Sequence, residues 1–400
     1  MDSAGSPAEP DIGSKRSFAY ALAAAGVVVA GALPVFLAGA LAVQLQDDIG
    51  LTAVGIGIAV GAYRGSAALV SVPLGRMADQ LGPTPALRLA VLVSAAASAG
   101  VALFANGLTS LVVALIIGGV GYALGQTAVN AFIANGVDRR HQGLAFGIKQ
   151  SAMPAAALGA GLAVPAIALT LGWRWAFGLA AVLGLLAVLA VPRVPRPERR
   201  SRAGLGLSMP MSAVLLLGVA LALGIGSAAT VSAFIVGAAV QAGLSPGPAG
   251  VVLSAGSALA ILVRVASGSL ADRRDGGHMR IVAGMLLVGA VGYLLLIIGS
   301  VPGVVVGGLI AIGAGWGFNG LFWFAVVRMN PGSAGAVTGV ILPIGLLGGV
   351  LGPIAGGWLV DDVSYAALWG AVAAWLVVGA ACIGWARRRY RRAVPATRSR

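Results

Sequence analysis

Long apolar runs, separated by short polar or charged stretches, repeat along the whole chain. About 20 apolar residues in a helix are enough to cross the ~30 Å hydrocarbon core of a bilayer. The runs therefore predict membrane-spanning helices near 18–43, 52–74, 86–105, 108–134, 143–169, 173–191, 211–240, 248–269, 279–300, 303–327, 335–360 and 364–386. The predicted fold is an all-α polytopic membrane protein with twelve transmembrane helices.

Composition supports the membrane interpretation. Of the 400 residues, 59% are hydrophobic and only 10% are charged, which leaves too little polar surface for a water-soluble globule of this length. Cys382 is the only cysteine, so an intrachain disulfide or a cysteine metal site is excluded.

The charged residues predict how the chain lies in the membrane. Most Lys and Arg residues lie at the N-terminus, in alternate loops, in the segment 192–210 and in the C-terminal tail, whereas Asp47, Asp48, Asp361 and Asp362 lie in the intervening loops. Because cytoplasmic loops carry an excess of Lys and Arg, we expect a multi-pass protein of the plasma membrane with both termini cytoplasmic. The net charge of +14 then indicates anionic lipid headgroups as partners. Nucleic acid is not expected, since the basic residues are spread over separate loops.

One short motif occurs twice at a fixed spacing. Gly75 to Asp79 is matched by Gly268 to Asp272, 193 residues further along the chain. Internal duplication in a long apolar chain is typical of transporters built from two repeats, with the substrate site between them. We therefore expect two pseudo-symmetric six-helix bundles. The predicted organisation is a cytoplasmic segment 1–17, a first bundle 18–191, a cytoplasmic linker 192–210, a second bundle 211–386 and a basic tail 387–400.

The repeated motif resembles a known family signature. Residues 75–82 read Gly-x-Met-Ala-Asp-x-x-Gly, and residues 268–273 read Gly-x-Leu-Ala-Asp-Arg. Both are similar to a loop signature of the major facilitator superfamily, and residues 172–177 (Gly-Trp-Arg-Trp-Ala-Phe) resemble the entry into its sixth helix. The resemblance covers essentially the whole chain. It implies the two-bundle fold of that superfamily and secondary transport by alternating access.

The resemblance also assigns a gate. In this family an acidic residue lies at the N-terminus of the following helix, where the helix dipole and nearby arginines hold the cytoplasmic side closed. Arg264 lies four residues before the second motif and is expected to join this gate. Because the first copy has Gln80 in place of the second copy's arginine, we expect its clamp to be weaker. The predicted gating residues are Gly75, Asp79, Gly268, Asp272, Arg273 and Arg264.

Two departures from family patterns concern coupling. Proton-coupled members carry an arginine four residues before Gly119, and this chain has Leu115 there. The glycine-proline motif that marks drug antiporters in the fifth helix is missing there, but a similar pattern occurs in the eleventh predicted helix, over residues 339–357. The resemblance therefore puts antiporter drug efflux in doubt.

Arg64 is the strongest candidate for substrate binding. It precedes Gly75 by 11 residues, which places it ~16 Å into a core whose half-thickness is ~15 Å. A midplane arginine costs ~2.5–3.5 kcal/mol to insert, so it should face the bundle interior or a wet cavity. It is either a group that coordinates an anion, since guanidinium suits planar oxyanions, or a structural residue hydrogen-bonded to backbone carbonyls or Tyr63.

Other polar residues in the spans complete the predicted site. Tyr122, Gln126 and Asn130 have the spacing of one helix face, and Trp316 and Asn319 lie at a corresponding depth. Packing or interhelical hydrogen bonding is the alternative for these residues, and extension to the cytoplasmic interface is the alternative for Lys149. The predicted substrate-binding residues are Arg64, Tyr122, Gln126, Asn130, Lys149, Trp316 and Asn319.

The acidic residues limit the mechanism. All of them fall in termini, loops or helix ends, and His141 and His278 lie in loops, so no buried group of the usual proton-relay kind lies in mid-membrane. We therefore expect a secondary transporter of a small organic or inorganic anion or weak acid, working by uniport, exchange or symport in which the proton travels on the substrate. The alternatives are efflux of amphipathic drugs or, more remotely, a non-transporting sensor or lipid-handling protein on the same scaffold.

The sequence does not point to catalysis. No nucleophile with a base, metal cluster or acidic pair is recognisable, so neither an enzyme nor a cofactor is expected. The expected partners are a small-molecule substrate and membrane lipids, and the expected state is a monomer.

Overall fold

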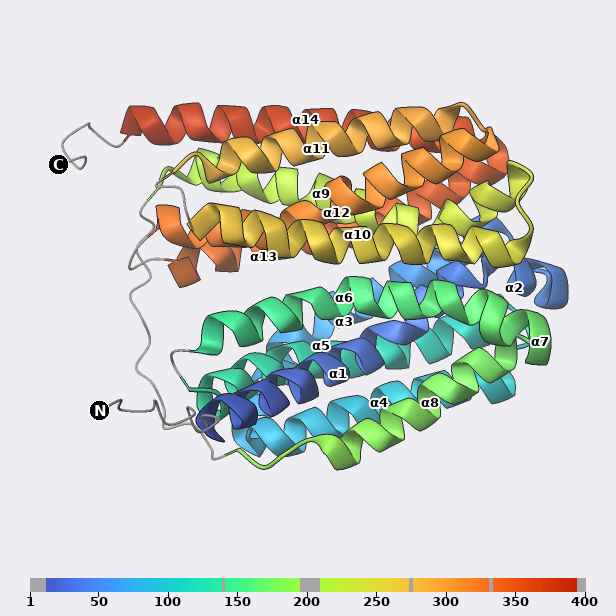
Figure 1. Ribbon diagram of the computed structural model, residues 1–400, viewed down its shortest axis with the longest axis horizontal. Coiled ribbons are helices and arrows are strands. Elements are labelled where there is room, and N and C mark those ends of the chain that lie inside the picture. The colour runs from blue at the N-terminus through green and yellow to red at the C-terminus, as the bar shows by residue number, and fades with distance from the viewer. Residues whose placement is uncertain (1–11, 139–140, 195–208, 273–275, 331–333, 394–400) are drawn as a thin grey trace, which may run out of the picture.

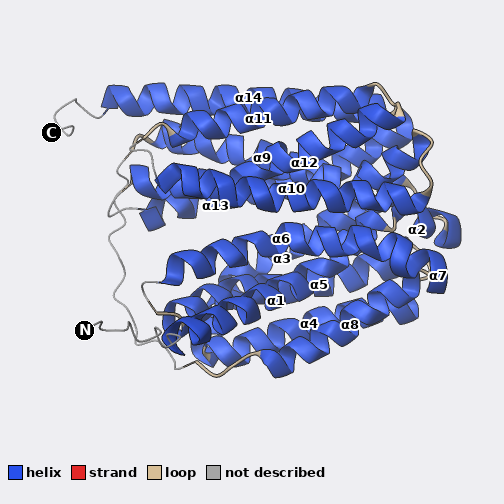
Figure 2. Ribbon diagram, in the orientation of Figure 1, coloured by secondary structure: helices blue, strands red, loops and turns tan. Residues whose placement is uncertain are grey.

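The computed structural model describes residues 12–138, 141–194, 209–272, 276–330 and 334–393. Over these residues the chain is helical with short connections and contains no strand (Figure 2). It has 12 helices long and apolar enough to cross a membrane, which confirms the predicted all-α membrane fold within the described part.

The first half of the chain forms one bundle and the second half forms another (Figure 1). The first bundle contains α1 (Ile12–Ala40), α2 (Ala42–Ile49), α3 (Ala53–Leu81), α4 (Pro83–Phe104), α5 (Leu108–Gly136), α6 (Gln142–Ala163), a π-helical turn (Val164–Ala168), α7 (Leu169–Leu171) and α8 (Trp173–Ala190). The second contains α9 (Met211–Gln241), α10 (Pro246–Asp272), α11 (His278–Ile297), α12 (Val301–Met329), α13 (Ala334–Asp362) and α14 (Tyr365–Ala393).

Both described ends of the chain lie on the same side of the molecule (Figure 1). We call this side, where α1 begins and α14 ends, the N/C end, and the opposite side, where α2 and Asp361 lie, the distal end. Most of the predicted linker, residues 195–208, lies outside the described residues, and the domain boundaries remain a prediction.

Glycines set the spacing within each bundle. A Cβ atom on Gly348 would overlap the Ala222 carbonyl of α9, and one on Gly352 would lie 2.8 Å from the Gly226 carbonyl of the same helix. Small residues allow such close backbone approach between membrane helices, which associate through packing because lipid tails are as apolar as leucine. The predicted smooth face of α13 therefore packs on α9.

The two bundles touch closely in the distal half. Gly57 of α3 lies against the Pro353 carbonyl of α13, and Gly39 of α1 lies against the backbone of Ser232 in α9. The Asp361 carboxylate accepts hydrogen bonds from Ala53 N (3.0 Å) and Val54 N (2.8 Å), so a residue of the second bundle caps the start of α3 in the first.

Toward the N/C end, the helix faces that contact the other bundle in the distal half become exposed. Val72 continues the face of α3 that carries Gly57, and it is 65% exposed. Val265 continues the face of α10 that packs on α6 through Ser254, and it is 63% exposed. On α13, Leu342 lies about three turns before Pro353 on the same face, and it is 44% exposed. The interface between the bundles is thus closed at the distal end and open at the N/C end.

Candidate functional site

Arg64 lies where the two bundles meet, near the middle of α3. Its half-buried side chain is beside Tyr63 and Tyr122 of the first bundle. A Cβ atom at Gly349 of α13 would lie 3.3 Å from Arg64 Cδ, so this glycine leaves room for the arginine. Arg64 Nε is shielded from solvent without a partner, and the side chain makes no hydrogen bond or ion pair with a described residue. The structural alternative of bonds to carbonyls or Tyr63 therefore does not account for Arg64.

Aromatic residues fix the wall around Arg64. The rings of Tyr63 and Tyr122 pack with their centroids 5.7 Å apart. Tyr63 donates a hydrogen bond to the Gly31 carbonyl of α1 at 2.6 Å, and the Tyr122 hydroxyl lies 3.4 Å from Met153 Sδ of α6. These contacts join α1, α3, α5 and α6 into one rigid surface next to the guanidinium.

Arg264 crosses from the second bundle to the first. Its guanidinium donates to the Gln150 carbonyl of α6 at 2.5 Å and to the Trp316 carbonyl of α12 at 3.1 Å. It also lies over the Trp316 ring, 5.6 Å from the centroid, and that ring packs against Phe36 of α1 at 5.7 Å. Trp316 is midway along α12, so Arg264 reaches the centre of the molecule, deeper than its position near the gating motif suggested.

Lys149 is the third cation of this region. Its side chain is only 9% exposed, and it makes no hydrogen bond or ion pair with a described residue. It is one position from Gln150, whose carbonyl holds Arg264. The buried side chain does not match the alternative in which Lys149 extends to the interface.

The remaining predicted residues divide between two depths. Gln126 lies beside the Tyr122 hydroxyl and is half-buried, as is Asn319 on α12. Asn130 is exposed and lies one turn of α5 beyond Gln126, toward the N/C end. Phe36 and Met153 were missed by the sequence analysis, because they are ordinary apolar residues of membrane spans until their neighbours are known.

The described acidic residues do not pair with these cations. Asp47, Asp48, Asp79, Asp138, Asp361 and Asp362 occupy helix ends or connections. The ion pair found among the described residues joins Arg174 Nη1 to Asp48 Oδ2 at 2.9 Å, at the distal end. Nor do the described residues contain a group of three His, Cys, Asp or Glu side chains that could hold a metal ion.

Comparison with known proteins identifies the family. The family model described as Major Facilitator Superfamily matches residues 17–350. The chain belongs to the Major Facilitator Superfamily. It is therefore a multi-pass membrane transporter, as the repeated motif predicted. A search of curated protein sequences finds no match.

Solved structures of the superfamily share the fold. A bacterial homolog of the human lysosomal transporter Spinster, inward-facing and occupied, has a TM-score of 0.75 at 16% identity, with 97% of this chain and 100% of that chain covered. The inward-facing, unoccupied form gives 0.73 at 16% identity over 95% and 99%. A mutant of the nucleoside transporter NupG gives 0.73 at 13% identity over 92% and 99%.

The two copies of the superfamily motif lie at the N/C end. Gly75 is in the last two turns of α3, and Gly268 is in the corresponding part of α10. Asp79 is exposed in the last turn of α3, four residues before α4 begins at Pro83, and its gating role remains a prediction. Arg273 and the side chain of Asp272 lie outside the described residues.

Proposed function

We propose that the protein transports a small anion or weak acid, bound between the bundles beside Arg64. The observation that carries the proposal is a central region with three cationic side chains, Arg64, Lys149 and Arg264, and no carboxylate paired with any of them among the described residues. A buried charge without a partner carries a desolvation cost of several kcal/mol. An anionic substrate would supply the missing counter-charge.

The three cations differ in what they offer a substrate. Arg264 donates hydrogen bonds to two backbone carbonyls. We therefore infer that it positions the wall formed by Trp316 and makes the electrostatic potential of the site more positive. The N–H groups of Arg64 make no hydrogen bond with a described residue, so they remain available to a substrate. A planar guanidinium can donate two parallel hydrogen bonds to a carboxylate or a similar oxyanion. Lys149 contributes a compact charge next to Gln150, whose carbonyl accepts a hydrogen bond from Arg264.

Alternating access follows from the arrangement of the bundles. With the basic ends cytoplasmic by the positive-inside rule, the exposed N/C faces of α3, α10 and α13 would open to the cytoplasm. We therefore infer an inward-facing state, in which the distal contacts at Gly57 and Asp361 separate the site from the outside. Transport would require these contacts to open while the N/C faces close.

An amphipathic substrate is the second candidate, and the aromatic side chains favour it. Phe36, Tyr63, Tyr122 and Trp316 surround the arginines and could pack on an apolar ring system. In that case Arg64 would take no part in binding, which is what separates the two candidates.

The test is ligand-dependent stabilisation of purified Arg64→Gln, followed by transport in proteoliposomes. A panel of carboxylates and inorganic oxyanions should raise the thermal midpoint of the wild type, because a ligand at 100 times its Kd stabilises the fold by ~2.7 kcal/mol. Arg64→Gln should fold and lose both the shift and uptake. Arg64→Lys should recover little, since an ammonium lacks the planar fork.

Arg388→Gln, which removes an exposed arginine of α14, is the matched control and should behave as wild type. Full transport by Arg64→Gln would contradict the anion proposal. Proton movement strictly coupled to a neutral substrate would contradict it as well, and either outcome would favour the amphipathic substrate.

A further inference from the structure

A basic cavity lies apart from the central site, at the N/C end of the first bundle. Its volume is about 540 Å³, within the ~300–1,000 Å³ usual for ligand pockets. The start of α4 and the segment after α8 form its walls. Its lining includes Thr84, Arg88, Leu89, Leu92 and Arg193.

Hydrogen bonds hold the two walls together. Thr84 Oγ1 accepts from Val194 N at 2.9 Å and donates to the Pro192 carbonyl at 3.1 Å. Arg88 Nη2 donates to the Val191 carbonyl at 3.0 Å, and the Tyr20 hydroxyl of α1 donates to the Arg193 carbonyl at 3.2 Å. These hydrogen bonds hold the segment that carries Arg193 against α4, so the shape of the cavity is determined by the packing of the bundle.

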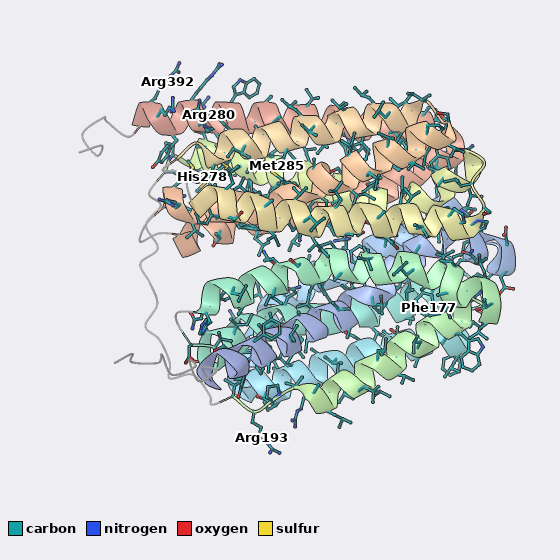
Figure 3. All side chains as sticks on the ribbon, in the orientation of Figure 1. Phe177, Arg193, His278, Arg280, Met285 and Arg392 are labelled. Carbon is teal, nitrogen blue, oxygen red and sulfur yellow. The ribbon has the colours of Figure 1, made fainter. Side chains whose placement is uncertain are left out.

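The cavity has a cationic end and an apolar end. Arg88 and Arg193 make no ion pair with a described carboxylate, and Arg88 Nε is shielded from solvent without a hydrogen-bond partner. Arg193 projects from the edge of the bundle (Figure 3). Leu89 and Leu92 follow the start of α4 at Pro83 by six and nine residues, line the same cavity, and remain 38% and 43% exposed.

We propose that this cavity binds the phosphate group of an anionic phospholipid from the leaflet at the N/C end. A phosphate oxyanion matches two arginines that lack an acidic partner, and basic pockets at this level of a membrane protein suit anionic headgroups. The exposed leucines lie deeper along α4, where an acyl chain would run. This apolar continuation favours a lipid over free phosphate, which has nothing to place against leucine. The proposal does not depend on the identity of the transported substrate.

The test measures lipid binding to the purified full chain by native mass spectrometry, with phosphatidylglycerol and phosphatidylcholine as probes. The wild type should retain phosphatidylglycerol in preference to phosphatidylcholine. Arg88→Gln/Arg193→Gln should weaken phosphatidylglycerol binding at least ~10-fold, since each basic residue near an anionic headgroup contributes about 1 kcal/mol. Arg193→Gln alone should weaken it several-fold, and it leaves the wall intact because the Arg193 side chain makes no hydrogen bond with a described residue.

Arg388→Gln/Arg392→Gln is the matched control, because it removes the same charge from exposed positions of α14 at the same end of the molecule and should bind phosphatidylglycerol as the wild type does. Equal losses in both double variants would overturn the proposal, as would equal retention of the two lipids by the wild type. A third arm adds inorganic phosphate. If phosphate alone displaced the lipid at concentrations comparable to the lipid's own Kd, the ligand would be free phosphate and the lipid assignment would be wrong.

Discussion

Arg64 and Arg264 carry the same guanidinium group in different surroundings, and these surroundings determine whether the group is available to a substrate. Arg264 donates to two backbone carbonyls, which partly offset the cost of burying its charge. Arg64 has no such bonds among the described residues. The sequence placed Arg64 at mid-membrane by counting residues along one helix. It could not reveal that the carbonyls of Gln150 and Trp316 approach Arg264, because those atoms come from two other helices.

At the distal end, Asp48 has a defined electrostatic role. Its carboxylate accepts from Trp173 Nε1 at 2.8 Å and from Arg174 Nη1 at 2.9 Å, and these hydrogen bonds hold the pKa of Asp48 below its ordinary value of ~3.9. A lowered folded-state pKa stabilises the fold above the unfolded value, and the effect disappears as pH falls through the folded pKa.

We therefore expect Asp48→Asn to lower the thermal midpoint by a few degrees at most at pH 7, since the carboxylate is exposed and solvent screens it. The difference from the wild type should persist down to about pH 4 and shrink as the pH falls further, through the lowered folded-state pKa of Asp48. Asp47→Asn is the control, because Asp47 is exposed and makes no hydrogen bond with a described residue. A difference that grew on acidification would show that the sign is wrong. The readout is the thermal midpoint measured from pH 7 down to pH 3.

At the scale of elements, α13 belongs to the second bundle but packs against helices of both bundles. Gly348 and Gly352 face α9 within its own bundle, whereas Pro353 and Gly357 face the backbone of α3 across the interface. The contact with α9 belongs to one bundle and persists if the bundles move as units. The contact with α3 has to break whenever the distal end opens. The glycine-proline pattern of residues 339–357, which the sequence related to drug antiporters, thus supplies close packing on two sides of one helix.

The cap that Asp361 places on α3 should favour the distally closed state. Asp361→Ala removes both acceptors from Ala53 N and Val54 N, and loss of such a cap costs about 1 kcal/mol, roughly fivefold in the ratio of two states. Thiol labelling of a Ser254→Cys reporter, buried at the closed distal interface, should therefore be several-fold faster from the distal side. Native Cys382 would be replaced by alanine so that only the reporter reacts.

Asp362→Ala offers a close control for this experiment. Asp362 is the next residue on the same helix, is exposed, and makes no hydrogen bond with a described residue. Its replacement should leave the labelling rate unchanged. Equal acceleration by the two substitutions would mean that the net charge of the loop matters and the cap on α3 does not.

On the scale of the whole molecule, orientation in the membrane determines what the open N/C end means. The positive-inside rule predicts that Arg387 to Arg392 lie in the cytoplasm and that the Asp361–Asp362 connection lies outside. A reporter fused after Arg392 should therefore be cytoplasmic, and an epitope inserted between Asp362 and Val363 should be accessible on intact cells. The reverse result would turn the inferred inward-facing state into an outward-facing one and would move the proposed lipid cavity to the other leaflet.

The sequence by itself determined the class of the protein. The period and length of the apolar runs predicted twelve spans, because only helices that satisfy their own backbone hydrogen bonds can cross lipid, and the repeated motif indicated the two-bundle superfamily fold. It also located Arg64 in depth, since helix rise converts residue number into distance.

Only the tertiary structure decided which of these positions meet. The partners of Arg264, the burial of Lys149, the position of Asp79 before the end of α3, and the closed distal interface all depend on contacts between helices distant in sequence. Many helix rotations and register shifts bury an apolar run equally well in lipid, so the hydrophobic pattern leaves them undetermined. Close packing of glycines and backbone carbonyls selects one of them, and that selection depends on three-dimensional shape.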